Sequence, residues 1–149
     1  MTTLKAGDKA PNFSGLDQDG NKIAFDNFKG KKLVVFFYPK ASTPGCTAEA
    51  CNLRDNYQTF QAQGYEIIGV SADSAKRQQN FKNKYELPYP LIADEDKAVI
   101  EAFGVWGPKK FMGKEYDGIH RTTFVIDENG IISEVITKVK TKEHAAQIL

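Results

Sequence analysis

The sequence predicts an α/β protein whose mixed central sheet carries helices on both faces. Continuous apolar runs in residues 31–39 and 65–73 are rich in β-branched and aromatic side chains, a pattern typical of buried strands. Helical patterns follow both runs, and strands that alternate with helices form parallel sheets. Residues 122–136 have the pattern of a hairpin, which adds antiparallel strands. A length of 149 residues suits one domain, so we expect a single domain over residues 1–149.

The first elements along the chain are a hairpin and a central strand. Residues 12–28 alternate like a hairpin, with Asp19 and Gly20 at its turn, so we expect an N-terminal β-hairpin extension. The apolar segment 31–39 follows as a buried central strand, and Pro39 ends it.

A long helix is predicted over residues 42–64, directly after this strand. Thr43 is a suitable N-cap, Pro44 a suitable first helical residue, and Gly64 a typical helix end. Because ligands bind outside the carboxyl ends of parallel strands, we expect the functional site where this helix begins.

The remaining elements are assigned in the same way. Residues 105–121 show no clear period and are predicted to be a long functional loop. The other predictions are a strand at 65–73, a polar helix at 74–87, a short strand at 89–94, a short helix at 96–104 closed by Gly104, the hairpin at 122–136 turning at Glu128–Asn129–Gly130, and a terminal helix at 142–149.

Composition excludes several classes of function. Lys and Arg number 20 and Asp and Glu 19, a net charge of +1, so nothing favours binding to nucleic acid or a membrane surface. The apolar runs are too short to span a bilayer, and the N-terminus lacks the apolar segment of a signal peptide. We therefore expect a cytoplasmic protein in a reducing compartment, where a purely structural disulfide is uncommon.

The two cysteines of the chain, Cys46 and Cys51, lie in the predicted helix. With Thr43 as N-cap, Cys46 is the third helical residue, where unpaired N–H groups and the helix dipole favour a thiolate. Five residues on a continuous helix separate the two Cα atoms by about 8.6 Å, beyond the ~7 Å that a disulfide tolerates. The pair can therefore bond only if the helix opens, which favours a cycling pair over a stabilising bridge.

Other uses of the two cysteines remain open from the residues alone. Buried cysteines can serve as small apolar side chains, and a thiol–disulfide oxidoreductase would normally carry a Cys-x-x-Cys motif, which is absent. A redox sensor or chaperone-like interaction protein could use the same helix opening as a switch. His120 and His144 have no ligand spacing to the cysteines, which disfavours a metal site or a Cys–His hydrolase.

Residues 36–55 resemble the active site of the peroxiredoxins, whose Pro-x-x-x-Thr-x-x-Cys motif matches Pro39, Thr43 and Cys46. The fuller segment FFYPKASTPGCTAEACNLRD is similar to the Q-type, or bacterioferritin comigratory, subfamily, and the similarity extends over nearly the whole chain. The resemblance implies a thioredoxin-like fold and thiol-dependent reduction of hydrogen peroxide and organic hydroperoxides.

The resemblance also implies roles for both cysteines. Cys46 matches the peroxidatic cysteine, which a peroxide oxidises to a sulfenic acid. Cys51 lies where some Q-type members have a resolving cysteine, which condenses with that sulfenic acid to an intramolecular disulfide. Thioredoxin or a similar dithiol would then reduce the disulfide. We expect no cofactor, no metal and a monomer.

Four further residues receive expected roles by position in the family pattern. Thr43 would hydrogen-bond the sulfur and the peroxide, and Arg121 would hold Cys46 as a thiolate and polarise the peroxide oxygens. Pro39 would shield the pocket from water, and Glu49 would orient Arg121.

Overall fold

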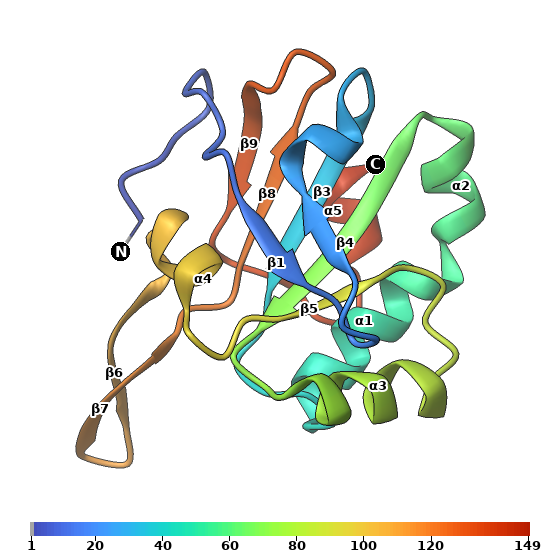
Figure 1. Cartoon of the computed structure of the whole chain (residues 1–149). Helices are drawn as coiled ribbons and strands as arrows, with labels where there is room; N and C mark the ends of the chain where they lie inside the picture. Colours follow the sequence, from blue (N-terminus) through green and yellow to red (C-terminus); the bar gives the residue numbers. More distant parts are fainter. Residues whose placement is uncertain (1) are drawn as a thin grey trace.

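The computed structural model describes residues 2–149 and contains a five-stranded mixed sheet in the order β5-β4-β3-β8-β9 (Figure 1). Its strands confirm the predicted mixed sheet, with the first apolar run at the centre. They are β3 (Lys32–Phe37), β4 (Tyr65–Ser71), β5 (Leu91–Ala93), β8 (Thr122–Ile126) and β9 (Ile132–Ile136).

Parallel and antiparallel pairing meet at β3. This strand pairs in parallel with β4, which pairs in parallel with β5, and on its other side it pairs antiparallel with β8. Phe37, the last residue of β3, lies opposite both Val70 and Thr122. The end of β3 therefore lies beside the start of β8, and segments distant in sequence meet at that edge of the sheet.

Alternate side chains of β3 supply two separate cores. Leu33, Val35 and Phe37 belong to one buried cluster, and the intervening Val34 and Phe36 belong to the other. Both faces of β3 are apolar because both are covered, as expected of a central strand in a parallel region.

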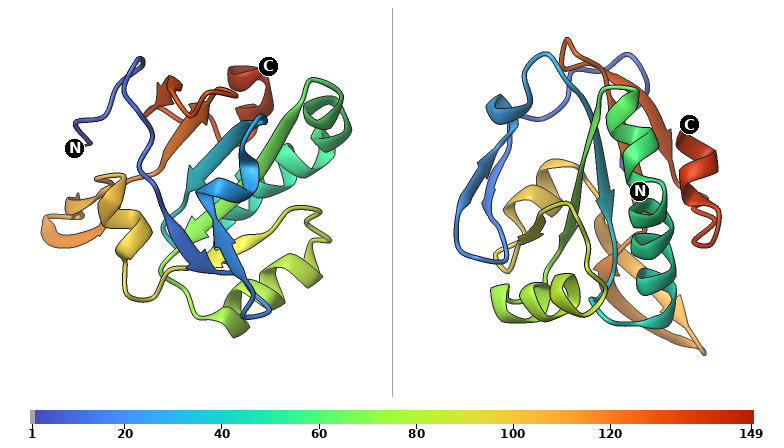
Figure 2. Two further views of the ribbon diagram at one scale, coloured as in Figure 1. Left: turned by 45° about the horizontal axis from the view of Figure 1, so that its top comes forward. Right: turned by 90° about the vertical axis from the view of Figure 1, so that its right-hand side faces the viewer.

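The helices cover the two faces unequally. On one face lie α1 (Pro44–Asp55), α2 (Tyr57–Ala62) and the terminal α5 (His144–Ile148) (Figure 2). The other face is covered by α4 (Ala98–Ala102) and the N-terminal hairpin, formed by β1 (Ser14–Leu16), β2 (Lys22–Ala24) and the 3-10 turn η1 (Phe25–Phe28); α3 (Ala75–Lys84) packs along the β5 edge.

The long helix predicted over residues 42–64 is two helices. It breaks at Asn56, whose backbone angles of φ −109° and ψ 11° lie outside the helical region. The Asn56 side chain donates to the backbone oxygen of Asn52, so it competes with the helical pattern in the way typical of asparagine.

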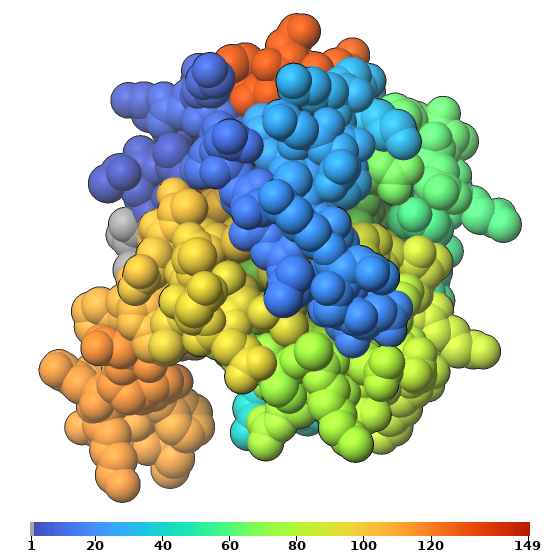
Figure 3. All heavy atoms as spheres, in the orientation of Figure 1, coloured from blue at the N-terminus to red at the C-terminus, as the bar shows by residue number. Residues whose placement is uncertain are grey.

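The prediction of a long loop over residues 105–121 is wrong. This segment is a second small hairpin, with β6 (Trp106–Phe111) paired antiparallel to β7 (Lys114–Ile119). Met112 and Gly113 have positive φ angles of 51° and 79°, as a two-residue hairpin turn requires. The hairpin projects from the body (Figure 3), and because much of both its faces meets solvent its residues need not alternate between polar and apolar.

The two predicted hairpins are confirmed. β1 and β2 flank Gly20, and β8 and β9 flank Gly130, each with a positive φ that glycine adopts at little cost.

Within residues 2–149, no helix has the length and apolar character needed to cross a membrane.

Candidate active site

The candidate site residues Cys46 and Arg121 lie beside the carboxyl end of β3, the place where we expect a functional site from the sequence. The connection from β3 to α1 is anchored by Asp73, which follows β4: its Oδ2 atom accepts hydrogen bonds from the Ala41 backbone N–H and from Ser71 Oγ, both at 2.7 Å. The loop also contains Ser42 in a left-handed conformation, with φ of 64°. These contacts fix the start of α1 beside two parallel strands.

Cys46 is the third residue of α1, as predicted, and its side chain is buried. Thr43 occupies the N-cap position, and its carbonyl accepts the first helical hydrogen bond from the Thr47 N–H. Its side chain, however, does not cap the helix. Thr43 Oγ donates instead to the backbone oxygen of Lys40 at 2.8 Å, so its proton is directed away from the Cys46 sulfur.

Arg121 joins two acidic groups of α1. Its Nη2 donates to Cys46 Sγ at 3.3 Å, and its Nη1 donates to Glu49 Oε1 at 2.7 Å. Arg121 directly precedes β8, so the pairing of β8 with β3 carries it to the start of the helix. Although burial opposes its charge, Cys46 and Glu49 together raise the pKa of Arg121. The guanidinium is thus held as a cation against the sulfur.

Glu49 has no solvent exposure. Burial raises the pKa of its carboxyl to about 7, although the charge of Arg121 and the hydrogen bond from it act in the opposite direction. Its second oxygen, Oε2, has no hydrogen-bond partner within residues 2–149 and lies 3.5 Å from Nε2 of His144. Glu49 therefore lies next to Arg121, as expected, but changes its charge near neutral pH.

His144 completes this cluster and was not identified from the sequence. It is buried on α5, and Thr123 Oγ on β8 lies 2.7 Å from its Nε2. Asn52 fixes α5 to α1, because its Oδ1 accepts from the Ala145 N–H at 2.7 Å and its Nδ2 donates to the Lys142 carbonyl at 3.0 Å. No motif links His144 to Glu49 in sequence; only the docking of α5 on α1 brings them together.

Gly45 leaves the space that Arg121 occupies. A Cβ atom at this position would lie 3.2 Å from Arg121 Nη2, closer than most such contacts. Glycine between Pro44 and Cys46 therefore allows the guanidinium to lie against the first turn of α1.

Cys51 is half-buried, further along the same unbroken helix. Both cysteines are free thiols, in agreement with the prediction that an intact helix keeps them apart. Burial raises the pKa of the Cys51 thiol, and the nearby charge of Arg54 lowers it. Cys51 is thus a thiol rather than a thiolate in this conformation.

Lys109 of β6 is a second residue that sequence reasoning missed. Its Nζ donates to the Ile119 carbonyl at 2.9 Å, and burial together with the charge of Arg121 lowers its pKa, while Cys46 acts in the opposite direction. The small hairpin therefore brings a further cation to the surroundings of the sulfur.

Pro39, two residues beyond β3, is half-buried.

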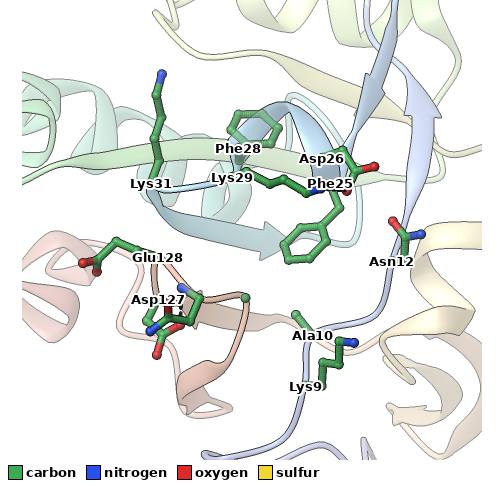
Figure 4. Close-up of a pocket in the computed structure, with 12 residues that line it drawn as sticks. Lys9, Ala10, Asn12, Phe25, Asp26, Phe28, Lys29, Lys31, Asp127 and Glu128 are labelled. Atoms are coloured by element: carbon green, nitrogen blue, oxygen red, sulfur yellow. Dashed lines mark hydrogen bonds and ion pairs between the residues drawn. The ribbon is translucent and has the colours of Figure 1, made fainter.

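A pocket of the described chain lies away from both cysteines. It has a volume of about 520 Å³ and lies between η1, the N-terminal segment and the β8–β9 turn (Figure 4). Its lining mixes both charges with two aromatic rings and includes neither cysteine. Within residues 2–149, no cluster of three or more His, Cys, Asp or Glu side chains could hold a metal ion.

Comparisons with known proteins agree on one family. The family model described as AhpC/TSA matches residues 6–135. The chain is 48% identical over 149 residues to peroxiredoxin Bcp of Escherichia coli (strain K12), covering 100% of this chain and 96% of that protein. Peroxiredoxin Q of Xanthomonas campestris superposes with a TM-score of 0.87 at 34% identity, covering 99% of this chain and 93% of the other. A cysteine-to-serine mutant of PrxQ from Xylella fastidiosa gives a TM-score of 0.92 at 28% identity, covering 99% and 94%.

The raised pKa of Glu49 gives a prediction for stability. The folded protein binds the Glu49 proton up to about pH 7 and the unfolded chain only up to about 4.5, so this group's contribution to stability falls as pH rises between those values. Glu49→Gln removes that loss. We expect its free energy of unfolding, relative to wild type, to increase by roughly 2 to 3 kcal/mol between pH 5 and pH 8.

Urea unfolding of both proteins at the two pH values measures this difference. Other carboxylates cancel in the comparison, because they are common to both chains. A difference that does not change with pH would show that Glu49 ionises normally in the folded protein.

Proposed function

The chain belongs to the AhpC/TSA family of peroxiredoxins, within its Bcp or Q-type members, and we propose that it reduces peroxides through a Cys46 sulfenic acid that Cys51 resolves. Peroxiredoxins are thiol-dependent peroxidases with a thioredoxin-like fold. This protein is likewise a thiol-dependent peroxidase and has that fold. The observation that carries the finer proposal is the position of Cys46: a buried sulfur at the start of α1, hydrogen-bonded by Arg121.

In the first step, the Cys46 thiolate attacks the terminal oxygen of the peroxide. An S–O bond forms and the O–O bond breaks, so the sulfur is oxidised by two electrons to a sulfenic acid. The leaving oxygen takes a proton from solvent and departs as water or an alcohol. The Arg121 guanidinium supports this step because its charge-assisted hydrogen bond stabilises the anionic sulfur and the negative charge that develops on the peroxide oxygens.

Thr43 has a narrower proposed role than the family resemblance implies. Its hydroxyl proton is engaged by the Lys40 carbonyl, so in this conformation the oxygen can only accept. We propose that it accepts the O–H of the bound peroxide and so orients the terminal oxygen toward Cys46. Glu49 would hold Arg121 in place through Nη1. Pro39 would shield the sulfur from water.

In the second step, the Cys51 thiol attacks the Cys46 sulfenic acid, forming a disulfide and releasing water. The unbroken helix between the two residues supports a requirement for local unwinding, because its geometry separates their Cα atoms too far for a disulfide. Attack and resolution therefore take place in two conformations. Thioredoxin or a similar dithiol would then reduce the disulfide by exchange, restoring both thiols.

Domain organisation, oligomeric state, location and partners are part of the same proposal. We propose that residues 1–149 form a single domain that acts as a monomer in the cytoplasm, without cofactor, metal, nucleic acid or membrane partner. Two free thiols in the folded chain suit a reducing compartment, and a net charge of +1 favours no polyanionic partner.

A coupled assay tests the proposed function. With hydrogen peroxide, thioredoxin, thioredoxin reductase and NADPH, we expect wild type to consume NADPH and Cys46→Ser to lose this activity, because serine supplies no thiolate. Cys51→Ser should lose thioredoxin-linked turnover but still form the sulfenic acid on Cys46, detected by mass spectrometry after one equivalent of peroxide. Full NADPH consumption by Cys46→Ser would refute the role of Cys46, and insulin reduction without peroxidase activity would indicate a thiol–disulfide oxidoreductase instead.

Hydrogen exchange tests the proposed unwinding. Oxidation to the Cys46–Cys51 disulfide should lower the protection of amides 47–55 and of α5, because Asn52 fixes α5 to α1. Amides of β4, which is buried in the sheet, serve as the internal control. Equal protection of α1 in both redox forms would show that the disulfide forms without opening the helix.

A further inference from the structure

His144 reaches the candidate site from the C-terminal helix through Glu49 rather than through the Cys46 sulfur. Its Nε2 lies 3.5 Å from Glu49 Oε2 and 2.7 Å from Thr123 Oγ, and both His144 and Glu49 are fully buried. The buried carboxyl oxygen has no hydrogen-bond partner within residues 2–149. A buried carboxylate oxygen without a donor is costly, and a neutral carboxyl costs less.

Gln147 determines which nitrogen of His144 carries the proton. The Gln147 Oε1 accepts from the Lys140 N–H at 2.9 Å, and its Nε2 donates to the Lys138 carbonyl at 3.0 Å, so backbone groups fix the orientation of the amide. The oxygen therefore faces His144 Nδ1 at 2.8 Å and must accept from it. In the neutral imidazole, Nδ1 therefore carries the proton and Nε2 carries none. The single lone pair of Nε2 accepts from the Thr123 hydroxyl at 2.7 Å.

This tautomer selects one form of Glu49. A carboxylate Oε2 beside the unprotonated Nε2 finds no donor there, so nothing on this side compensates the burial of its negative charge. Burial lowers the pKa of His144, which keeps the imidazole neutral, and burial raises the pKa of Glu49 to about 7. Glu49 can keep its bond to Arg121 in either form, because Oε1 remains an acceptor.

We propose that His144 is a positioning residue of the peroxidatic site, which favours neutral Glu49 by offering its carboxylate no donor and so directs the charge of Arg121 to Cys46. The inference rests on the proposed role of Cys46. When Glu49 ionises, it competes with the sulfur for the guanidinium and adds a negative charge nearby. The oxidation of Cys46 by peroxide should then slow.

The groups that face this pair come from every element packed around it. Glu49 is influenced by Arg121 before β8, by Cys46 on its own helix, by His144 on α5 and by Tyr89 before β5, whose hydroxyl donates to the Ala50 carbonyl. Burial raises the pKa of Tyr89 well above its usual value and lowers that of His144, whereas it raises the pKa of Glu49 to about 7. Glu49 is therefore the group through which this cluster responds to pH near 7.

The test changes Gln147 rather than His144, because replacing the fully buried ring would disturb the packing of α5 on α1. Gln147→Glu places a carboxylate at Nδ1, which favours the imidazolium and puts a proton on Nε2. That proton can donate to Glu49 Oε2 and stabilise the carboxylate. The rate of Cys46 oxidation is measured against pH by stopped-flow mixing with hydrogen peroxide.

We expect the wild-type rate to decrease on the alkaline side with an inflection near pH 7. In Gln147→Glu this inflection should move to lower pH by at least about one unit, the size of shift that an opposite charge at such distances produces. In Glu49→Gln it should be absent, because glutamine does not ionise. A profile of Gln147→Glu that coincides with wild type would overturn the proposal, and so would an inflection near pH 7 that persists in Glu49→Gln.

Two matched controls separate this effect from general electrostatics. Ala146→Glu adds the same charge at the exposed neighbouring position of α5, and His120→Gln removes the other histidine of the chain. Both should leave the inflection in place. An equal shift in Ala146→Glu would show that any charge on α5 suffices, which would overturn a specific role for His144.

A second readout is independent of peroxide chemistry. The ¹³C chemical shift of the Glu49 side-chain carboxyl, assigned by its loss in Glu49→Gln, reports its ionisation directly. It should titrate near pH 7 in wild type and at lower pH in Gln147→Glu. If Cys46 did not react with peroxide at all, the proposed function would fail, but this titration would still test the role of His144. A Glu49 titration that is the same in Gln147→Glu and wild type would overturn that role.

Discussion

The pair of hydrogen bonds that Arg121 donates is the interaction on which the site depends. A buried sulfur and a buried carboxyl both need polar partners, and one guanidinium serves both, through separate nitrogens. The planar, forked shape of arginine allows this, and lysine could not reproduce it. Gly45 provides the space for the guanidinium, and burial of Glu49 raises the pKa of that carboxyl to about 7.

The topology of the sheet creates that contact. Because β3 pairs in parallel with β4 and antiparallel with β8, the end of β3 meets both the anchoring Asp73 after β4 and Arg121 before β8. The helix that begins there places Cys46 in its first turn and Glu49 one turn later on the same buried side. The α5 helix then covers Glu49 from outside the sheet, so residues from three distant parts of the chain meet around this carboxyl.

The sequence predicts the local parts of this arrangement better than its long-range contacts. The apolar run of β3, the Thr43–Pro44 helix start and the place of Cys46 follow from nearby residues, and the structure has each of them. The break at Asn56 and the β6–β7 hairpin were missed because a side-chain hydrogen bond and an exposed two-residue turn leave no clear periodicity. The contact of His144 with Glu49 was missed because it depends on how a terminal helix docks, which no local pattern encodes.

The most direct test of this account is the rate of Cys46 oxidation by hydrogen peroxide in Arg121→Met, compared with wild type. Methionine retains much of the apolar stem of arginine but supplies neither the charge nor the donors. We expect a decrease of about 10²-fold, as for the loss of one donor that stabilises a developing negative charge. Arg54→Met, which removes the cation beside Cys51, serves as the control and should react with peroxide at nearly the wild-type rate. A rate in Arg121→Met within twofold of wild type would contradict the central role of Arg121.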